Sequence, residues 1–126
     1  MNIQEISILV VDDEPVIRNL FKDLLGDQGY RVTTVSNGIE AVEAVKRQRY
    51  DVAFMDVHMP IMNGLEALIE VIKVQPDINV VMLDSYPDQL LAESEKKGAV
   101  TCIHKPFNIK EVIDFIETVS QKKTCS

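Results

Sequence analysis

The chain has 126 residues, of which 46% are hydrophobic and 26% charged, and this suits one globular domain. Its net charge of −7 and its pI near 4.7 argue against nucleic-acid binding, because phosphate backbones are bound by basic surfaces. No apolar run approaches the roughly 20 residues of a membrane span, and the first residues do not form a signal peptide.

An apolar run over residues 6–11 predicts the first strand, and it ends in the acidic pair Asp12 and Asp13. Pro15 favours the first turn of a helix whose apolar residues recur at helical spacing. Gly29 follows the end of that helix, as is common after a helical segment. The first unit of the chain is therefore a strand, an acidic turn and a helix.

The second strand is predicted over residues 31–35, and a helix begins after Ser36 and Asn37. The third strand, over residues 51–55, is a continuous apolar run that ends abruptly in one carboxylate, Asp56. Continuous apolar runs are typical of strands that helices cover on both faces.

A third helix follows Gly64 and stops before Pro76, and a fourth strand is predicted over residues 79–83. The fourth helix, over residues 87–97, carries a thin apolar stripe. We expect this helix to pack lightly and to move easily.

The fifth strand, over residues 99–103, is followed by the segment HKPF at 104–107. Asn108 and Glu111 lie three residues apart at the start of the last helix, close to the capping-box pattern. The polar tail 121–126 is expected to fray.

Five strands alternating with five helices predict an α/β fold with a parallel sheet and helices on both faces. We expect one domain over residues 1–126. Ligand sites in such sheets lie beyond the carboxyl ends of the strands. Asp12, Asp13, Asp56 and Lys105 all follow strands, so they are predicted to meet at that edge.

These four residues suit phosphoryl transfer. Mg²⁺ prefers oxygen ligands and takes one or two carboxylates together with phosphate oxygens. An aspartate can itself be the nucleophile and form an aspartyl phosphate, while Lys105 contributes a mobile positive charge. Each residue alone has a structural explanation, for example Asp13 as a helix cap, but their joint placement favours the functional one.

Other sites lack support in the sequence. There is no GxxxxGK(S/T) loop, no GxGxxG turn after the first strand and no GxSxG elbow. His58 and His104 lie near the predicted site, and neither is assigned a proton-transfer role. Cys102 and Cys125 form no CxxC pair, which argues against structural zinc, and they predict free thiols in a reducing cytoplasm.

Three motifs together resemble the receiver domain of two-component response regulators. They are ILVVDDE at 8–14, MDVHMPIMNG at 55–64 and HKPF at 104–107. The segment GAVTCIHKPFNIKEV at 98–112 is similar to single-domain receivers of the sporulation phosphorelay, and chemotaxis-type receivers are the other comparison. The resemblance implies a flavodoxin-like (βα)5 fold, doubly wound, with strand order 2-1-3-4-5.

The resemblance also implies a role for each matching residue. Asp56 corresponds to the phosphoacceptor, and Asp13 to a direct Mg²⁺ ligand that Asp12 supports. The main-chain carbonyl of His58 corresponds to a further ligand, and Lys105 to the lysine that pairs with the phosphoryl group. The implied phosphodonor is a histidine kinase or a histidine phosphotransfer protein, and the domain is a signalling module, not an enzyme with a separate substrate.

Two positions depart from the family pattern. Asp84 stands where the family has Thr or Ser, whose hydroxyl contacts the phosphoryl group; Ser85, the next residue, could supply that hydroxyl. An ionised Asp84 would repel phosphoryl oxygens, by up to about 4 kcal/mol at 4 Å in an effective dielectric near 20, unless it points away and caps the fourth helix. Cys102 stands where the family usually has an aromatic residue or histidine that rotates as a switch.

These observations leave more than one function open. The first is a phosphoacceptor receiver that signals through a protein partner at the face of the fourth helix, fifth strand and fifth helix. The second is a degenerate receiver, a binding module that phosphate no longer switches, as Asp84 and Cys102 favour. A dehalogenase-like phosphatase needs a DxD pair after the first strand, and the chain lacks it. We expect a monomer without an output domain, either a stand-alone protein or a piece of a longer regulator.

Overall fold

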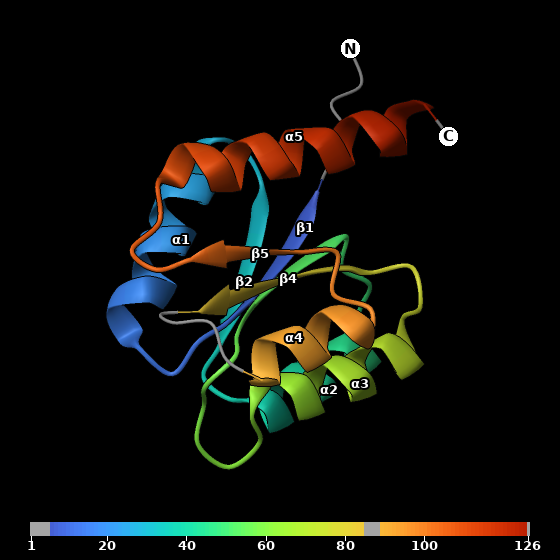
Figure 1. The fold of residues 1–126 in the computed structure, drawn as a ribbon. Coiled ribbons are helices and arrows are strands. Elements are labelled where there is room, and N and C mark those ends of the chain that lie inside the picture. The colour runs from blue at the N-terminus through green and yellow to red at the C-terminus, as the bar shows by residue number, and fades with distance from the viewer. Residues whose placement is uncertain (1–5, 85–88, 126) are drawn as a thin grey trace.

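The structure, a computed structural model, describes residues 6–84 and 89–125. Strands and helices alternate throughout this part of the chain (Figure 1). The strands are β1 (Ser7–Val11), β2 (Arg31–Val35), β3 (Val52–Asp56), β4 (Asn79–Asp84) and β5 (Thr101–His104). The helices are α1 (Pro15–Asp27), α2 (Gly38–Arg47), α3 (Gly64–Val74), α4 (Gln89–Lys96) and α5 (Ile109–Cys125).

The five strands form one parallel sheet in the order β2-β1-β3-β4-β5. This confirms the predicted α/β class and strand order. The strands start close to their predicted positions, but Asp56, Asp84 and His104 are the last residues of β3, β4 and β5. The sequence placed each of them just after its strand, because their polar side chains mark the point where the apolar run ends.

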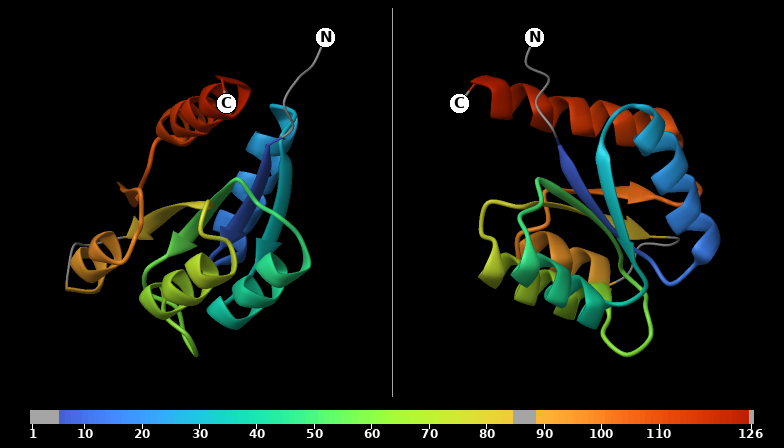
Figure 2. Two further views of the ribbon diagram at one scale, coloured as in Figure 1. Left: turned by 90° about the vertical axis from the view of Figure 1, so that its right-hand side faces the viewer. Right: turned by 180° about the vertical axis from the view of Figure 1, so that it is seen from behind.

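Helices cover both faces of the sheet, as Figures 1 and 2 show. On one face α1 and α5 pack on β-strand residues such as Phe54, and the ring centroids of Phe21 and Phe54 lie 5.2 Å apart. On the other face α2, α3 and the partly buried Leu90 of α4 pack on residues such as Met55 and Met82. Consecutive residues of a strand alternate between the two cores, so each strand is apolar almost throughout.

Three helix ends show how local sequence sets the boundaries. The Asn63 side chain accepts from the main-chain N–H of Glu66, whose carboxylate accepts from Asn63 in return, so α3 begins with a full capping box. At the start of α5 the Asn108 side chain accepts from Lys110. In the described part of the chain α5 runs on to Cys125, through most of the segment that was expected to fray.

The predicted fourth helix lies partly outside the described residues, because its expected start at Pro87 and the neighbouring Ser85 are not among them. Its described part, α4, contacts α3 and β4, and buried Ser94 donates its hydroxyl to the carbonyl of Leu90 at 2.8 Å. Among the residues described, no helix combines the length and the apolar character that crossing a membrane requires.

Candidate functional site

Three carboxylates meet at the carboxyl edge of the sheet, as the sequence predicted. Asp12 follows β1 and Asp56 ends β3, and these two strands are neighbours. Asp12, Asp13 and Asp56 each place one carboxylate oxygen within 4.8 Å of the others. Asp12 is fully buried and Asp56 is 6% exposed, whereas Asp13 faces solvent. Two members of the cluster are thus buried in the core, and the cluster is open to solvent at Asp13.

Lys105, just beyond β5, brings an ammonium group into this cluster. Its Nζ lies 2.9 Å from Asp12 Oδ2, 3.6 Å from Asp56 Oδ2 and 3.3 Å from Glu14 Oε1. The Lys105 side chain is only 11% exposed. Sequence reasoning missed the contact with Glu14, although its place directly after the acidic pair was a usable signal.

The lysine does not balance the carboxylates around it. Burial, and then the charge of Asp12, raise the pKa of Asp56 to about 6. Burial also raises the pKa of Asp12, even though it accepts a hydrogen bond from Lys105. For Lys105 burial acts to lower the pKa, but its contacts with Asp12, Asp56 and Glu14 outweigh this and raise it. A site with excess negative charge and oxygen donors fits Mg²⁺.

Main-chain groups hold the two buried carboxylates in place. The N–H of Glu14 donates to Asp12 Oδ1 at 2.9 Å. The Arg18 guanidinium donates instead to the main-chain carbonyl of Asp12 at 2.8 Å, which fixes the backbone that carries this carboxylate. The N–H of His58 donates to Asp56 Oδ1 at 3.3 Å. The second oxygen of each carboxylate therefore faces Lys105, and the predicted use of the His58 carbonyl as a metal ligand stays a prediction.

The loop after β3 is closed tightly behind Asp56. The N–H of Gly64 donates to the carbonyl of Val57 at 2.8 Å. A Cβ atom on Gly64 would lie 2.4 Å from the main-chain oxygen of Asp56, so only glycine fits at this point. Between Val57 and Gly64, the φ angle of Ile61 is 73°, in a backbone region that β-branched residues rarely occupy. The Ile61 side chain is 77% exposed.

The carboxylate of Asp84 is fully buried at the end of β4. Its Oδ1 accepts from the Cys102 thiol at 3.1 Å and lies 2.7 Å from His104 Nδ1. The Asp84 side chain thus contacts β5, on the face of the sheet that α4 covers. The sequence had left open that this side chain caps the fourth helix. Burial, followed by the hydrogen bond to Asp84, raises the pKa of Cys102 to about 12, so the thiol keeps its proton at neutral pH.

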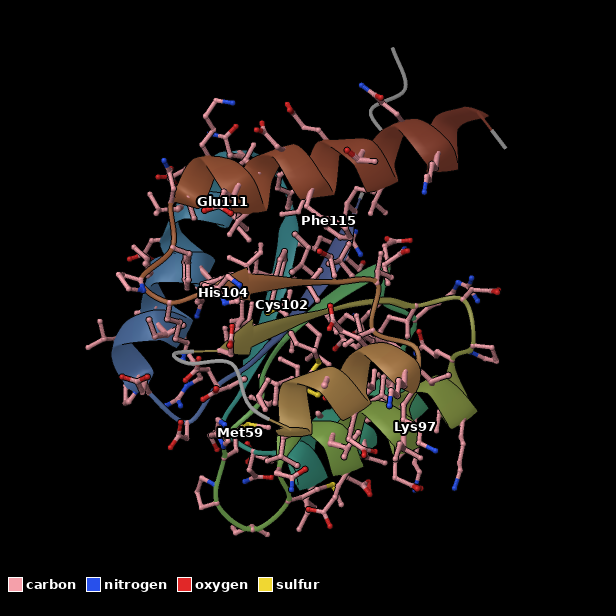
Figure 3. All side chains as sticks on the ribbon, in the orientation of Figure 1. Met59, Lys97, Cys102, His104, Glu111 and Phe115 are labelled. Carbon is pink, nitrogen blue, oxygen red and sulfur yellow. The ribbon has the colours of Figure 1, made fainter. Side chains whose placement is uncertain are left out.

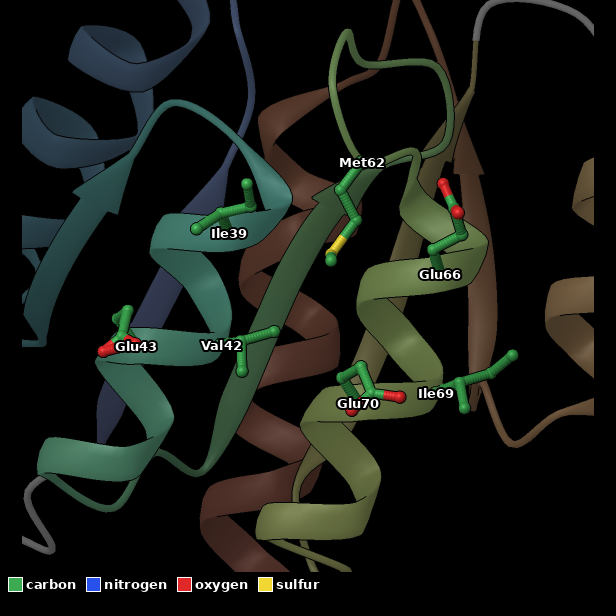
Figure 4. A pocket seen from close by; sticks show the side chains of 7 residues that line it. All are labelled: Ile39, Val42, Glu43, Met62, Glu66, Ile69 and Glu70. Carbon is green, nitrogen blue, oxygen red and sulfur yellow. The ribbon is translucent and has the colours of Figure 1, made fainter.

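One apolar hollow lies beside the site, and another lies away from it. One, of about 570 Å³, adjoins Lys105 and is lined by Ile17, Leu20, Pro106 and Phe107 with Glu14. The other, of about 430 Å³, lies between α2 and α3, away from the acidic cluster (Figure 4). It is lined by apolar side chains and three glutamates: Ile39, Val42, Met62, Ile69, Glu43, Glu66 and Glu70. None of these seven lining residues carries a positive charge that could bind a phosphate.

The chain belongs to the response regulator receiver domain family, whose profile matches residues 8–117. It is therefore a receiver domain of two-component systems. Receiver domains work with histidine kinases or phosphotransfer proteins, and they bind Mg²⁺ in an acidic active site of the kind that Asp12, Asp13 and Asp56 form.

Relatives of known name support this assignment. The chain is 35% identical to chemotaxis protein CheY of Thermotoga maritima, over 90% of this chain and 97% of that one. It is 32% identical to sporulation initiation phosphotransferase F of Bacillus subtilis, over 88% and 90% of the two chains.

Solved structures agree. A CheY-like receiver domain protein from Methanospirillum hungatei superposes with a TM-score of 0.90 at 26% identity, over 98% of this chain and all of the other. The receiver domain of sensor histidine kinase PA1611 from Pseudomonas aeruginosa has a TM-score of 0.84 at 30% identity, over 94% and 99%, and that structure has magnesium in its active-site cleft.

Proposed function

We propose that this receiver accepts a phosphoryl group from a phosphohistidine on Asp56. The observation that carries the proposal is the position of Asp56, which ends a central strand next to two further carboxylates with Lys105 Nζ 3.6 Å from its oxygen. A nucleophile, a place for a divalent cation and a fixed positive charge then surround one point. Phosphoryl transfer depends mostly on such positioning and charge neutralisation.

In the proposed step one carboxylate oxygen of Asp56 forms a bond to phosphorus while the bond from phosphorus to the donor's imidazole nitrogen breaks. The electron pair of the broken bond stays on that nitrogen, which can then take a proton from solvent. Asp56 must be ionised to attack, so its raised pKa of about 6 still leaves the nucleophile available at neutral pH. Lys105 is placed to pair with a phosphoryl oxygen after transfer.

Mg²⁺ would be held by oxygens of Asp13 and Asp56, with Asp12 in support, and would offset the repulsion between these carboxylates and the phosphoryl oxygens. Asp12 cannot give up all its contacts to a cation, because Glu14 N–H and Lys105 hold its two oxygens. This favours Asp13, the exposed member of the cluster, as the more direct ligand.

The contacts of Asp84 bear on the alternative, a receiver that phosphate does not switch. Its Oδ1 is engaged by Cys102 and His104 on β5, which supports a carboxylate held to one side of the phosphoacceptor. We therefore prefer the phosphorylated receiver, with Asp84 tuning the site. The hydroxyl suggested for Ser85 lies outside the described residues.

The hollow beside Lys105 is the surface we propose for the phosphodonor. It adjoins Lys105, the side chain proposed to pair with the phosphoryl group, and its lining residue Leu20 is 39% exposed. Val16, one helical turn before Leu20 on α1, is 75% exposed. A donor protein that presents a phosphohistidine there can bury these side chains during transfer. The change Val16→Lys should slow transfer from a phosphorylated protein donor and leave phosphorylation by a small phosphodonor unchanged.

The downstream partner is proposed to bind the face formed by α4, β5 and α5. Support comes from β5, which is an edge strand of the sheet, and from Val100 beside it, which is 52% exposed. Amide exchange measured with and without beryllium fluoride, a phosphoryl mimic, tests this; an unchanged α4 would count against the assignment. A monomeric state and a cytoplasmic location complete the proposal.

The experiment for the central claim is intact-protein mass after incubation with Mg²⁺ and a small phosphodonor such as acetyl phosphate. Parent, Asp56→Asn, Asp84→Thr and the control Asp51→Asn are compared. Asp51 lies just before β3 and accepts a hydrogen bond from Ser7, so this control changes a carboxylate at the opposite end of the same strand.

We expect one phosphoryl adduct on the parent and on Asp51→Asn, and none on Asp56→Asn. A faster or fuller reaction of Asp84→Thr would make Asp84 a tuning residue. If the parent stays unmodified while Asp84→Thr is phosphorylated, the proposal fails and the phosphate-independent binding module is the better account.

A further inference from the structure

A second group of metal-binding side chains lies at the ends of β4 and β5. Asp84, Cys102 and His104 each offer one atom, an oxygen, a sulfur and a nitrogen, and these atoms lie within 4.8 Å of one another. None of the three belongs to the cluster of Asp12, Asp13 and Asp56. Figure 3 labels Cys102 and His104 on β5, beside the end of β4.

The sheet itself brings these residues together. Cys102 and His104 are two positions apart on β5, so their side chains leave the strand on the same side. Asp84 is the register partner of His104 on β4, which places its side chain on that side as well. Regular strands therefore hold all three donors, and rigid elements position ligands more accurately than loops.

The carboxylate of Asp84 provides a second, independent observation that points to a ligand. The residue is fully buried, and Oδ2 has no hydrogen-bond partner among the residues that the structure describes. Its other oxygen, Oδ1, is approached by both the Cys102 thiol and His104 Nδ1. A buried carboxylate oxygen without a hydrogen-bond partner is costly, and binding of a cation would remove that cost.

We propose that Asp84, Cys102 and His104 form a Zn²⁺ site, distinct from the Mg²⁺ site of the receiver. A carboxylate, an imidazole and a cysteine thiolate are all ordinary zinc ligands, and the ion would displace the Cys102 proton into solvent on binding. Mg²⁺, by contrast, takes oxygen ligands and does not favour sulfur. Three protein ligands leave one position of a tetrahedral ion for water. The absence of a CxxC pair argues only against a closed structural site, and this site is open.

The site has a route to solvent and a link to the phosphoacceptor region. The His104 side chain is 66% exposed, so an ion can reach the site from solvent past the imidazole and bind the buried carboxylate of Asp84. The carbonyl of Asp84 accepts a hydrogen bond from the N–H of Lys105. A cation on Asp84 would thus fix the ends of β4 and β5 one residue away from the lysine of the acidic cluster.

The test is a titration of the reduced, metal-free protein with Zn²⁺ by isothermal titration calorimetry, in the presence of excess Mg²⁺. Co²⁺ is titrated in parallel, because a cysteine thiolate bound to cobalt gives a charge-transfer absorption that carboxylates alone do not. The variants are Cys102→Ser and His104→Gln, with Cys125→Ser as the matched cysteine control. His104→Gln alters an exposed side chain, so its folding is secure even if Cys102→Ser is destabilised.

We expect one equivalent of Zn²⁺ and the thiolate absorption with Co²⁺ in the parent and in Cys125→Ser. Loss of a residue that only orients a ligand costs about 10–100-fold in metal affinity, so each ligand variant should lose at least about 100-fold. Asp13→Asn separates the two metal sites and should keep zinc binding whether or not Asp56 accepts phosphate.

Three results would overturn the zinc site. The first is no zinc binding by the parent under these conditions. The second is undiminished binding by both Cys102→Ser and His104→Gln. The third is loss of zinc binding in Asp13→Asn with no thiolate absorption in the parent, which would place the ion in the acidic cluster.

Discussion

The buried charge of Asp56 should make the metal-free protein less stable at neutral pH than a variant without that charge. The ordinary pKa of an aspartate is 3.8, and burial with the charge of Asp12 raises that of Asp56 to about 6. One pKa unit corresponds to about 1.4 kcal/mol, so ionised Asp56 lowers the free energy of unfolding by about 3 kcal/mol. Asp56→Asn removes this penalty while keeping nearly the same shape.

The sign and the pH window follow from proton binding. Between about pH 4 and pH 6 folded Asp56 holds a proton that the unfolded chain has released. Stability therefore falls as the pH rises through this window, and the full loss is present above about pH 6. The asparagine variant has no such proton, so its advantage should be about 3 kcal/mol at pH 8 and close to zero at pH 4.

Urea denaturation in EDTA at several pH values from 4 to 8 measures this difference directly. Asp51→Asn, a carboxylate-to-amide change at the other end of the strand, controls for the substitution itself. An advantage of Asp56→Asn that does not change with pH, or a variant less stable than the parent at pH 8, would refute the reasoning. Adding Mg²⁺ at pH 8 should stabilise the parent and not the variant.

Three further changes test separate features of the site. Ile61→Asn should raise the free energy of unfolding by about 1 kcal/mol, because asparagine tolerates the left-handed backbone at φ 73° and the isoleucine side chain that is lost is exposed. An unchanged midpoint of urea denaturation would contradict this. Gly64→Ala should lower the free energy of unfolding by about 2 kcal/mol, because the added Cβ would meet the main-chain oxygen of Asp56. Gly26→Ala is the control and should cause no such loss, because a Cβ there would enter open space. Equal effects of the two changes in urea denaturation would argue against the close approach at Gly64. Without metal at pH 8, Lys105→Met should lower the free energy of unfolding by about 3 kcal/mol, because it leaves the buried carboxylates of Asp12 and Asp56 without their positive partner. Mg²⁺ should restore part of this loss. No recovery of stability on titration with Mg²⁺ would contradict this account.

The fold and the acidic cluster could be predicted from the sequence because both depend on simple patterns. Apolar runs that helices cover on both faces mark the strands, and parallel strands bring the residues at their carboxyl ends to one edge. Asp12, Asp56 and Lys105 therefore meet as expected, although they are far apart in the chain. The strand order came from the family resemblance, since periodicity alone does not determine it.

The contacts of single side chains were beyond this reasoning. Asp84 could point toward the phosphoryl group, cap the fourth helix or turn to β5, and only the register with His104 decides among them. Glu14 stands at the start of α1 without making a capping bond, which leaves its carboxylate for Lys105. In both cases several partners of similar energy compete for one short side chain, and their relative positions are set by tertiary packing.

The closed loop between Val57 and Gly64 restricts where a partner-specific side chain can be placed. Because the N–H of Gly64 is bonded to the carbonyl of Val57, the segment leaves β3 and returns to the same point. The exposed Ile61 between these ends can be exchanged while Asp56 stays where it is, whereas Met59 is buried and the N–H of His58 is bonded to Asp56. This exposed position can therefore carry a recognition side chain beside a shared chemical centre, so two receivers with the same acidic cluster can still discriminate between protein partners.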